Sequence, residues 1–316
     1  MKPFELLLYS MVVFGWSTSW LPLKWQLGVV APEVSLLWRF VIAATVMFVI
    51  SIYLRQSLMF HWRTHLRLAL LGLCIFSTNF AFFYHGGKGV ASGLLAVVFS
   101  SASLVNVVMT AVLGRSRPRI EHLFAAMVGL TGVVCLFWPE LQLSNTALTS
   151  LALCLIGTLF FCTGNMVSAA CQKRGIPIFA SASWGMLYGA CYLALFSFIS
   201  NHEFIIEPTA KYVLGLVWLA LVSSVMTFAA YLSLIGRIGP SRAGYATVIF
   251  PVFALLISTV FESYTWSSLA FIGLGLVIFG NVIMLRARSR TGDGDYPIVG
   301  AKAVANSDTV APAVKM

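Results

Sequence analysis

Long apolar runs separated by short polar segments recur along the whole chain. Each run holds about 18 to 25 residues, and a helix needs about 20 apolar residues to cross the hydrocarbon core of a bilayer. Only helices and closed barrels satisfy their backbone groups in lipid. The pattern therefore predicts an all-α integral membrane protein with ten transmembrane helices, at residues 4–23, 33–54, 67–87, 89–113, 121–138, 148–170, 178–200, 212–235, 241–261 and 265–286.

The ten predicted helices divide into two halves of similar element order. An offset of 148 residues lays the segment 71–73 on 219–221, and sparse further identities follow the same offset. Because five helices is an odd number, the second half would cross the membrane in the opposite direction to the first, as in many secondary transporters. We predict two inverted five-helix repeats, at residues 1–144 and 145–288.

Composition and charge support the membrane interpretation. Hydrophobic residues make up 59% of the chain and charged residues 9%, whereas a soluble domain carries roughly 25% charged residues. The predicted inner loops hold 14 Lys and Arg residues and the outer loops 3, which places both termini in the cytoplasm. The net charge of +10 is not accompanied by an aromatic-basic motif, so we expect a lipid bilayer and no nucleic acid as partner.

The chemistry-bearing residues exclude several classes of protein. None of the six cysteines has CxxC spacing, so we expect neither a disulfide framework nor a metal site, and no cofactor. The sequence has no HExxH, no GxSG and no paired intramembrane aspartates, which argues against an enzyme. After Arg290 the sequence is poor in large apolar residues, and we predict that residues 289–316 form a disordered cytoplasmic tail.

Four segments resemble the EamA-type exporters of the drug/metabolite transporter superfamily. Two departures from that family's pattern are Ser103, where the fourth helix often has a proline, and Gly114-Arg115, where it often ends in Gly-Glu. The resemblance implies a ten-helix secondary transporter of the cell (inner) membrane that exports small metabolites such as amino acids. The segments are "FGWSTSWLPLKW" (14–25), "LLWRF" (36–40), the hairpin 82–118, and "GPSRAGYATVIFPVFALLISTVFE" (239–262).

Arg39 is a permanent cation inside a predicted span. It lies six positions after Glu33, or about 9 Å below the predicted outer end of the helix. Its guanidinium could snorkel to the outer headgroups, or it could have a structural role and donate to backbone carbonyls. A third possibility is a functional role, in which it binds a carboxylate of the solute or closes an outer gate. With the repeats aligned on Trp38 and Trp184, the partner of Arg39 is Gly185, so only one half carries the charge.

Uncharged polar residues gather at mid-depth on several predicted helices. Each of them could bond a neighbouring helix, but together they predict a cavity between the two halves. Near the predicted outer end of the third helix, His85 is either a turn residue or, since its ordinary pKa lies near 6.5, a proton relay. The candidate solute-binding residues are Trp16, Ser17, Arg39, Asn79, Ser100, Ser103, Asn106, Asn165, Thr227, Tyr231, Tyr245 and Pro251.

The function predicted from these features is that of a secondary transporter. It would move a small zwitterionic or amphipathic solute, by export, through alternating access to the central cavity. The alternatives are a channel, a membrane-embedded sensor or an intramembrane enzyme. The segment "GMLYG" (185–189) is a small-xxx-small pattern, which favours helix packing, either within the chain or between the subunits of a homodimer.

Overall fold

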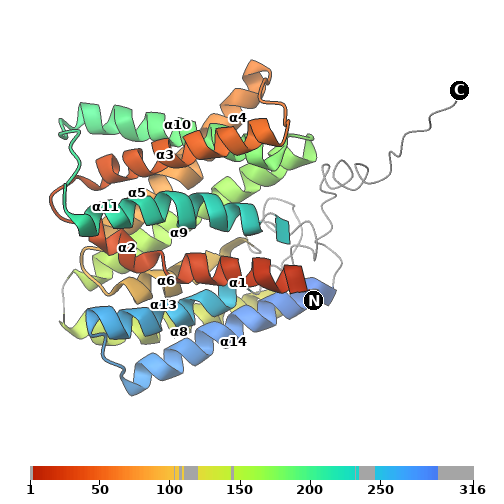
Figure 1. Ribbon diagram of the computed structural model, residues 1–316. Helices are drawn as coiled ribbons and strands as arrows, with labels where there is room; N and C mark the ends of the chain where they lie inside the picture. The colour runs from red at the N-terminus through yellow and green to blue at the C-terminus, as the bar shows by residue number, and fades with distance from the viewer. Residues whose placement is uncertain are drawn as a thin grey trace, which may run out of the picture.

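In the computed structural model the described part of the chain forms helices joined by loops, with no strand (Figure 1). The described residues are 3–102, 104–106, 109, 120–143, 146–231, 233–234 and 246–290. The helices are α1 (Pro3–Ser17), α2 (Trp20–Trp25), α3 (Pro32–Tyr53), α4 (Trp62–Leu73), α5 (Asn79–Gly86), α6 (Ser92–Ser100), α8 (Ile120–Leu143), α9 (Ala147–Lys173), α10 (Ile178–Ile199), α11 (Ala210–Val217), α13 (Ala246–Glu262) and α14 (Ser268–Arg290), with π-helical segments η1 (Cys74–Thr78) and η2 (Trp218–Met226).

Several of these helices join end to end into longer apolar segments. Six segments are long and apolar enough to cross a membrane: Pro3–Trp25, Pro32–Tyr53, Trp62–Gly86, Ala147–Lys173, Ile178–Ile199 and Ala210–Tyr231. Four shorter apolar helices are Ser92–Asn106, Leu123–Pro139, Ile249–Glu262 and Ser268–Ile283. In chain order, these segments match the ten predicted spans.

Local backbone chemistry explains where the helices start and stop. Pro32 stands in the first turn of α3, where its fixed φ suits a helix and its missing N–H would have no partner in any case. After α9, Gly175 adopts a φ of +77°, the left-handed conformation that commonly ends a helix. Pro177 follows as the N-cap of α10, so the chain reverses within a few residues.

Successive segments run back and forth between two faces of the molecule. α1 begins, and α14 ends, on the same face, which we call the N-terminal face (Figure 1). α9 begins beside Gly89, just after α5, whereas α10 begins beside Gln56, just after α3, because the Ala180 N–H donates to the Gln56 carbonyl oxygen at 3.1 Å. α9 therefore starts on the face opposite to the start of α1, as an inverted second half requires.

Small residues let two helix pairs approach closely. A Cβ on Gly72 of α4 would lie 2.6 Å from the Gly185 carbonyl oxygen of α10, and one on Gly132 of α8 would lie 2.6 Å from the Gly273 carbonyl oxygen of α14. Gly185 and Gly189 face α4 and η1 within the same chain. The small-xxx-small pattern is therefore a packing surface inside the protein, and these two positions are not available to a second subunit.

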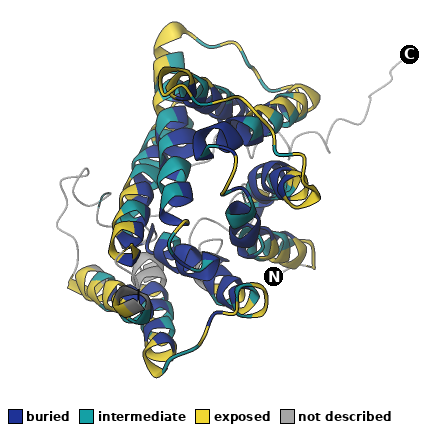
Figure 2. Ribbon diagram, turned by 90° about the vertical axis from the view of Figure 1, so that its left-hand side faces the viewer, coloured by how far each residue is buried: buried dark blue, intermediate teal, exposed yellow. Residues whose placement is uncertain are grey.

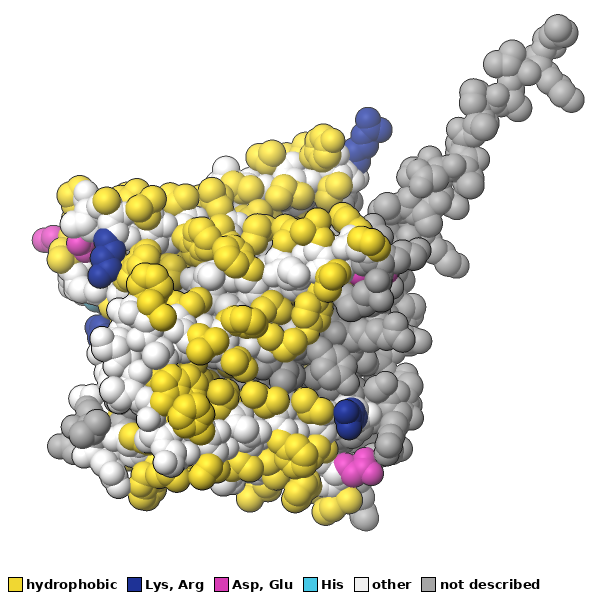
Figure 3. Space-filling view, turned by 60° about the horizontal axis from the view of Figure 1, so that its bottom comes forward, with side chains coloured by type: hydrophobic (Ala, Val, Ile, Leu, Met, Phe, Trp, Pro, Cys, Tyr) yellow, Lys and Arg dark blue, Asp and Glu magenta, His cyan; other side chains and the backbone are white. Residues whose placement is uncertain are grey.

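The outer surface of the helix bundle is apolar. Viewed along the helices, buried residues turn toward the centre and exposed ones toward the periphery (Figure 2). On the face seen in Figure 3, hydrophobic side chains cover the middle and the charged side chains stay near the two ends. Phe198 is 73% and Val260 75% exposed, an arrangement suited to lipid rather than water.

The end of α14 differs slightly from the prediction. α14 continues through Arg290, into the first two residues of the predicted tail at 289–316. Residues 291–316 lie outside the described part of the chain.

Candidate functional site

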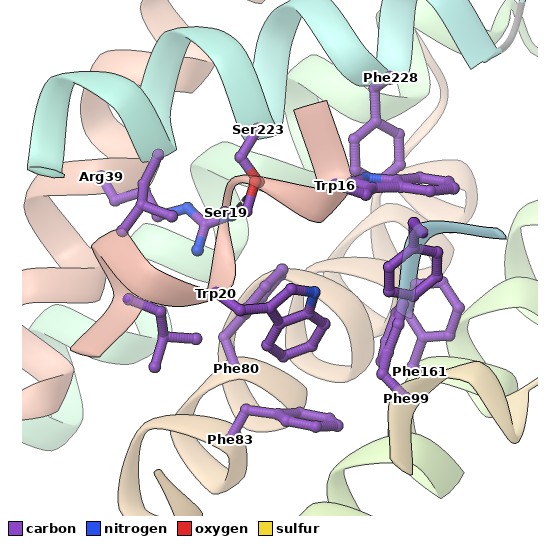
Figure 4. A pocket seen from close by; sticks show the side chains of 13 residues that line it. Trp16, Ser19, Trp20, Arg39, Phe80, Phe83, Phe99, Phe161, Ser223 and Phe228 are labelled. Carbon is purple, nitrogen blue, oxygen red and sulfur yellow. Dashed lines mark hydrogen bonds between the residues drawn. The ribbon is translucent and has the colours of Figure 1, made fainter. Parts of the chain in front are cut away.

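A cavity lies at the centre of the bundle, between helices of both predicted halves. Its empty volume is about 570 Å³, which includes the space at its openings. Figure 4 shows its side chains converging from several helices. The cavity is lined by Trp16, Ser19, Trp20, Leu23, Arg39, Phe80, Phe83, Phe99, Phe161, Leu219, Ser223, Phe228 and Phe250.

Aromatic rings make up most of the cavity wall. Trp20 of α2 is stacked with Phe250 of α13, with ring centroids 6.4 Å apart, and contacts Phe83 of α5 at 5.5 Å. Phe99 of α6 meets Phe161 of α9 at 4.6 Å. Edge and tilted contacts of this kind fix ring orientation, so the wall is a preformed apolar surface.

Among the described lining residues, Arg39 carries the only permanent charge. It is 2% exposed. Its Nε donates to Ser224 Oγ at 3.1 Å and an Nη donates to Ser223 Oγ at 3.3 Å. The guanidinium carbon lies 4.4 Å from the centre of the Phe80 ring. Among the described residues no carboxylate pairs with Arg39. The snorkelling prediction is therefore wrong, because the side chain is buried and turns into the bundle.

The π-helical segment η2 supplies the two hydroxyls. Ser224 Oγ donates to the Leu219 carbonyl oxygen at 3.0 Å, five residues back, the spacing of a π-helix. The hydroxyl oxygen is thus free to accept from Arg39. Single π-turns often mark functional sites, and here the extra residue per turn brings Ser223 and Ser224 side by side onto the face that meets α3.

The two halves differ at this contact. The offset of 148 residues places η1 on the last five residues of η2 and Phe76 on Ser224. At one contact Arg39 of the first half meets Ser224 of the second. At the related contact a Cβ on Gly185 of the second half would lie 2.9 Å from the Phe76 ring of the first. One contact between the halves is therefore a charge and a hydroxyl, and the other a tightly packed glycine and ring.

Two of the predicted binding residues, Trp16 and Arg39, line the cavity. Ser17 and Tyr231 lie beside it: Ser17 Oγ donates to the Phe250 carbonyl oxygen at 3.2 Å, and the Tyr231 ring lies 5.0 Å from that of Trp16. Trp16, Ser17 and Tyr231 therefore gather at one end of the cavity, and Arg39 lies toward the other (Figure 4).

Other predicted residues bond their own helices instead. Asn79 Nδ2 donates to the Ile75 carbonyl oxygen at 3.3 Å, Ser100 Oγ to that of Val97 at 2.7 Å, and Thr227 Oγ1 to that of Val222 at 2.7 Å. None of the three lines the cavity.

Three further predicted residues are also absent from the lining. Pro251 is buried in α13 next to Phe250, while Asn106 and Asn165 are partly buried. Ser103 and Tyr245 lie outside the described residues.

Most of the aromatic wall escaped prediction. The chain has 24 phenylalanines, and in an apolar span a ring that faces lipid looks the same in sequence as one that faces a cavity. Trp20 and Ser19 could have been found, because both lie within the first-helix segment that resembles the transporter family. Ser223 and Ser224 stood out as a polar pair in an otherwise apolar run.

His85 lies away from the central cavity. Its Nε2 is 2.7 Å from Glu33 Oε1, and Glu33 Oε2 is 3.7 Å from His202 Nδ1. His85 belongs to the last turn of α5 and lines a second cavity with an empty volume of about 950 Å³, between α5 and α10. The two candidate chemistries, the buried guanidinium and the histidine, are thus held at separate places.

The central cavity is closed toward the face opposite the N-terminal face. Leu23, Arg39 and Phe83, which lie toward that face, are 3%, 2% and 1% exposed. Phe161 and Phe228, which lie farther from it, are partly exposed.

Comparison with known proteins agrees with this architecture. The chain is 25% identical over 245 residues to an uncharacterized inner membrane transporter, YedA, of Escherichia coli, covering 77% of this chain and 78% of the relative. It is 24% identical over 246 residues to an uncharacterized transporter, YoaV, of Bacillus subtilis, covering 77% and 84%. A protein of known crystal structure shares the fold with a TM-score of 0.64 at 18% identity, over 92% of this chain and all of that one.

The family comparison matches both halves of the chain separately. The model of the EamA-like transporter family matches residues 3–138 and again residues 148–286. With the helical architecture and the apolar surface, the double match identifies a multi-pass membrane transporter and not an enzyme. The chain belongs to the EamA-like transporter family.

Proposed function

We propose that this protein is a secondary transporter that exports a small amphipathic solute bearing a carboxylate, of the amino-acid class, by alternating access to the central cavity. Arg39 would bind the carboxylate and the aromatic wall would enclose the apolar part. The N-terminal face, where α1 begins and α14 ends, would lie in the cytoplasm, as the bias of Lys and Arg in the sequence predicts.

The observation that carries the proposal is the buried, unpaired charge of Arg39 at the cavity wall. A charge removed from water is costly unless it is paired and hydrogen-bonded. Ser223 and Ser224 engage two of its N–H groups, and a guanidinium has five in a planar fork. A carboxylate could therefore make the bidentate contact for which arginine is suited, and it would neutralise the charge only while the solute is bound.

The rest of the cavity suits the remainder of such a solute. The faces of Trp16, Trp20 and Phe250 could hold an apolar side chain or, by cation–π attraction, an ammonium group. The part of the lining that the structure describes includes no carboxylate that would compete with the solute for Arg39. A site of this kind holds a zwitterion through one fixed charge and releases it more easily than a site with two.

The test is flux measured with purified protein in vesicles. We expect a gradient-dependent movement of at least one labelled amino acid or similar carboxylate, reduced by Arg39→Gln. The matched control is Arg63→Gln, which removes an exposed arginine from the first turn of α4 and leaves the cavity unchanged. Comparing right-side-out with inside-out vesicles gives the direction.

The outcomes separate the competing functions. Flux that saturates with concentration indicates a carrier, whereas single-channel conductance would indicate a channel. If Arg39→Gln and Arg63→Gln transport equally well, the carboxylate site at Arg39 is wrong. If solutes without a carboxylate compete as well as those with one, the proposed solute class is wrong although the protein is still a transporter.

A further inference from the structure

The Glu262 carboxylate contacts residues at the ends of three helices on the face opposite the N-terminal face. Glu262, the last residue of α13, has one oxygen 3.2 Å from Lys24 Nζ of α2. Its other oxygen accepts from the Ser92 backbone N–H of α6 at 2.9 Å, from the Ser92 hydroxyl, and from Ser258 Oγ at 2.6 Å. Lys24 Nζ also donates to the Val90 carbonyl oxygen at 2.8 Å. We call these five residues the Glu262 cluster.

The Glu262 cluster sits at the end of the helices that form the cavity. Lys24 directly follows Leu23, a lining residue. Ser92 begins α6, which carries Phe99 to the cavity seven residues further on, or about 10 Å along the helix. Since Leu23 is only 3% exposed, the cluster caps the side on which the cavity is closed.

The contacts join the two predicted halves of the chain. Lys24, Val90 and Ser92 belong to the first half, and Ser258 and Glu262 to the second. The Glu262 side chain is 12% exposed and that of Lys24 29%. Charge-assisted hydrogen bonds shielded from water in this way are about twice as strong as neutral ones, so the halves cannot separate here without losing several of them.

We propose that the Glu262 cluster is the gate of the cavity on this face, closed in this structure and opened when Lys24 and Ser92 release Glu262. The proposal goes beyond the proposed function by assigning residues to one step, and it rests on alternating access. A purely structural contact would persist in every conformational state of the transport cycle. A gate must open once in each cycle, so weakening it changes the fraction of molecules whose cavity faces this side.

The experiment measures that fraction directly, without the solute. Ser19→Cys places a thiol in the cavity wall, and its reaction with a membrane-impermeant maleimide added outside intact cells reports opening toward that face. The unsubstituted chain, with its six native cysteines, gives the background. Glu203→Gln is the matched control, because Glu203 is an exposed carboxylate that takes no part in the cluster.

We expect slow labelling of Ser19→Cys alone and with Glu203→Gln. Glu262→Ala removes every contact to the carboxylate and should raise the labelling rate by about tenfold or more, the effect of losing one charged hydrogen bond. Lys24→Met keeps the bonds from Ser92 and Ser258 and should give a smaller increase. Size-exclusion profiles in detergent show whether each variant is folded.

Several results would contradict the proposal that the Glu262 cluster is a gate. Labelling of folded Glu262→Ala at the rate of Glu203→Gln would show that the cluster does not control access. Rapid labelling of Ser19→Cys in the otherwise unchanged chain would show that the cavity is not closed on this side. A carrier that moves no carboxylate but still shows the graded labelling would refute the proposed solute and leave the gate standing.

Discussion

Replacing Arg39 by methionine should stabilise the empty protein while abolishing solute binding. Arg39 is 2% exposed and pairs with no carboxylate among the described residues. Its described contacts are two hydroxyls at 3.1 and 3.3 Å, the faces of Phe40 and Phe80 at 5.2 and 4.4 Å, and the neighbouring Tyr84 side chain, none of which carries a negative charge to offset its lost hydration. A buried ion without a countercharge retains a penalty of several kcal/mol.

The expected changes in stability and in KM follow from these contacts. Exchanging buried ionic groups for apolar ones of similar volume is often stabilising by about 1–4 kcal/mol, so Arg39→Met should raise the melting temperature of the solute-free protein. Losing one partner of a buried charge pair costs about 2–5 kcal/mol. The KM for a carboxylate solute should therefore rise by at least about 30-fold, at tenfold for each 1.4 kcal/mol.

Thermal unfolding in detergent and initial flux rates in vesicles measure the two effects on the same preparations. Solute should raise the melting temperature of the unsubstituted protein and not that of Arg39→Met. If Arg39 were a structural clamp, Arg39→Met would instead lower the melting temperature. A lower melting temperature together with an unchanged KM would refute the assignment of Arg39 to the solute.

Three further substitutions test other contacts. Gly15→Ala places a Cβ onto Thr227 Oγ1, so it should destabilise the protein by about 1–3 kcal/mol. Adding Thr227→Ala should recover most of the lost stability in thermal unfolding, and additive effects of the two substitutions would contradict the predicted clash. His85→Gln can still donate to Glu33, so a structural His85 predicts unchanged flux at every pH, whereas a proton relay predicts loss of flux driven by a pH gradient. Phe99→Ala enlarges the cavity and should let bulkier solutes compete for transport; a competition profile like that of the unsubstituted protein would place Phe99 outside the solute path.

Helical membrane architecture was readable from the sequence because it depends on local properties. Apolar run length alone decides whether a segment can cross a bilayer, and the ten predicted runs reappear as helical segments in the same order. The small-xxx-small pattern at Gly185 and Gly189 was recognisable for the same reason, since close helix approach needs residues without bulky side chains.

The composition of the cavity was not readable in this way. Asn79, Ser100 and Thr227 lie at mid-depth, as the cavity prediction assumed, but each donates to a carbonyl of its own helix. In a bilayer such local bonds are always within reach, so a polar residue at the right depth need not face a cavity. Rotation of each helix about its axis decides which side chains face inward, and sequence does not fix it when every face is apolar.

What the sequence by itself determined is that this chain crosses a membrane as two similar halves, and that Arg39 is the one charge more than two residues from the end of a predicted span. Tertiary structure decided where that charge points. The π-turn of η2 sets Ser223 and Ser224 against it, and rings from α2, α5, α6 and α13 surround the same space. The physical reason is that hydropathy depends on each residue alone, whereas a site depends on how helices distant in the chain turn their side chains toward one another.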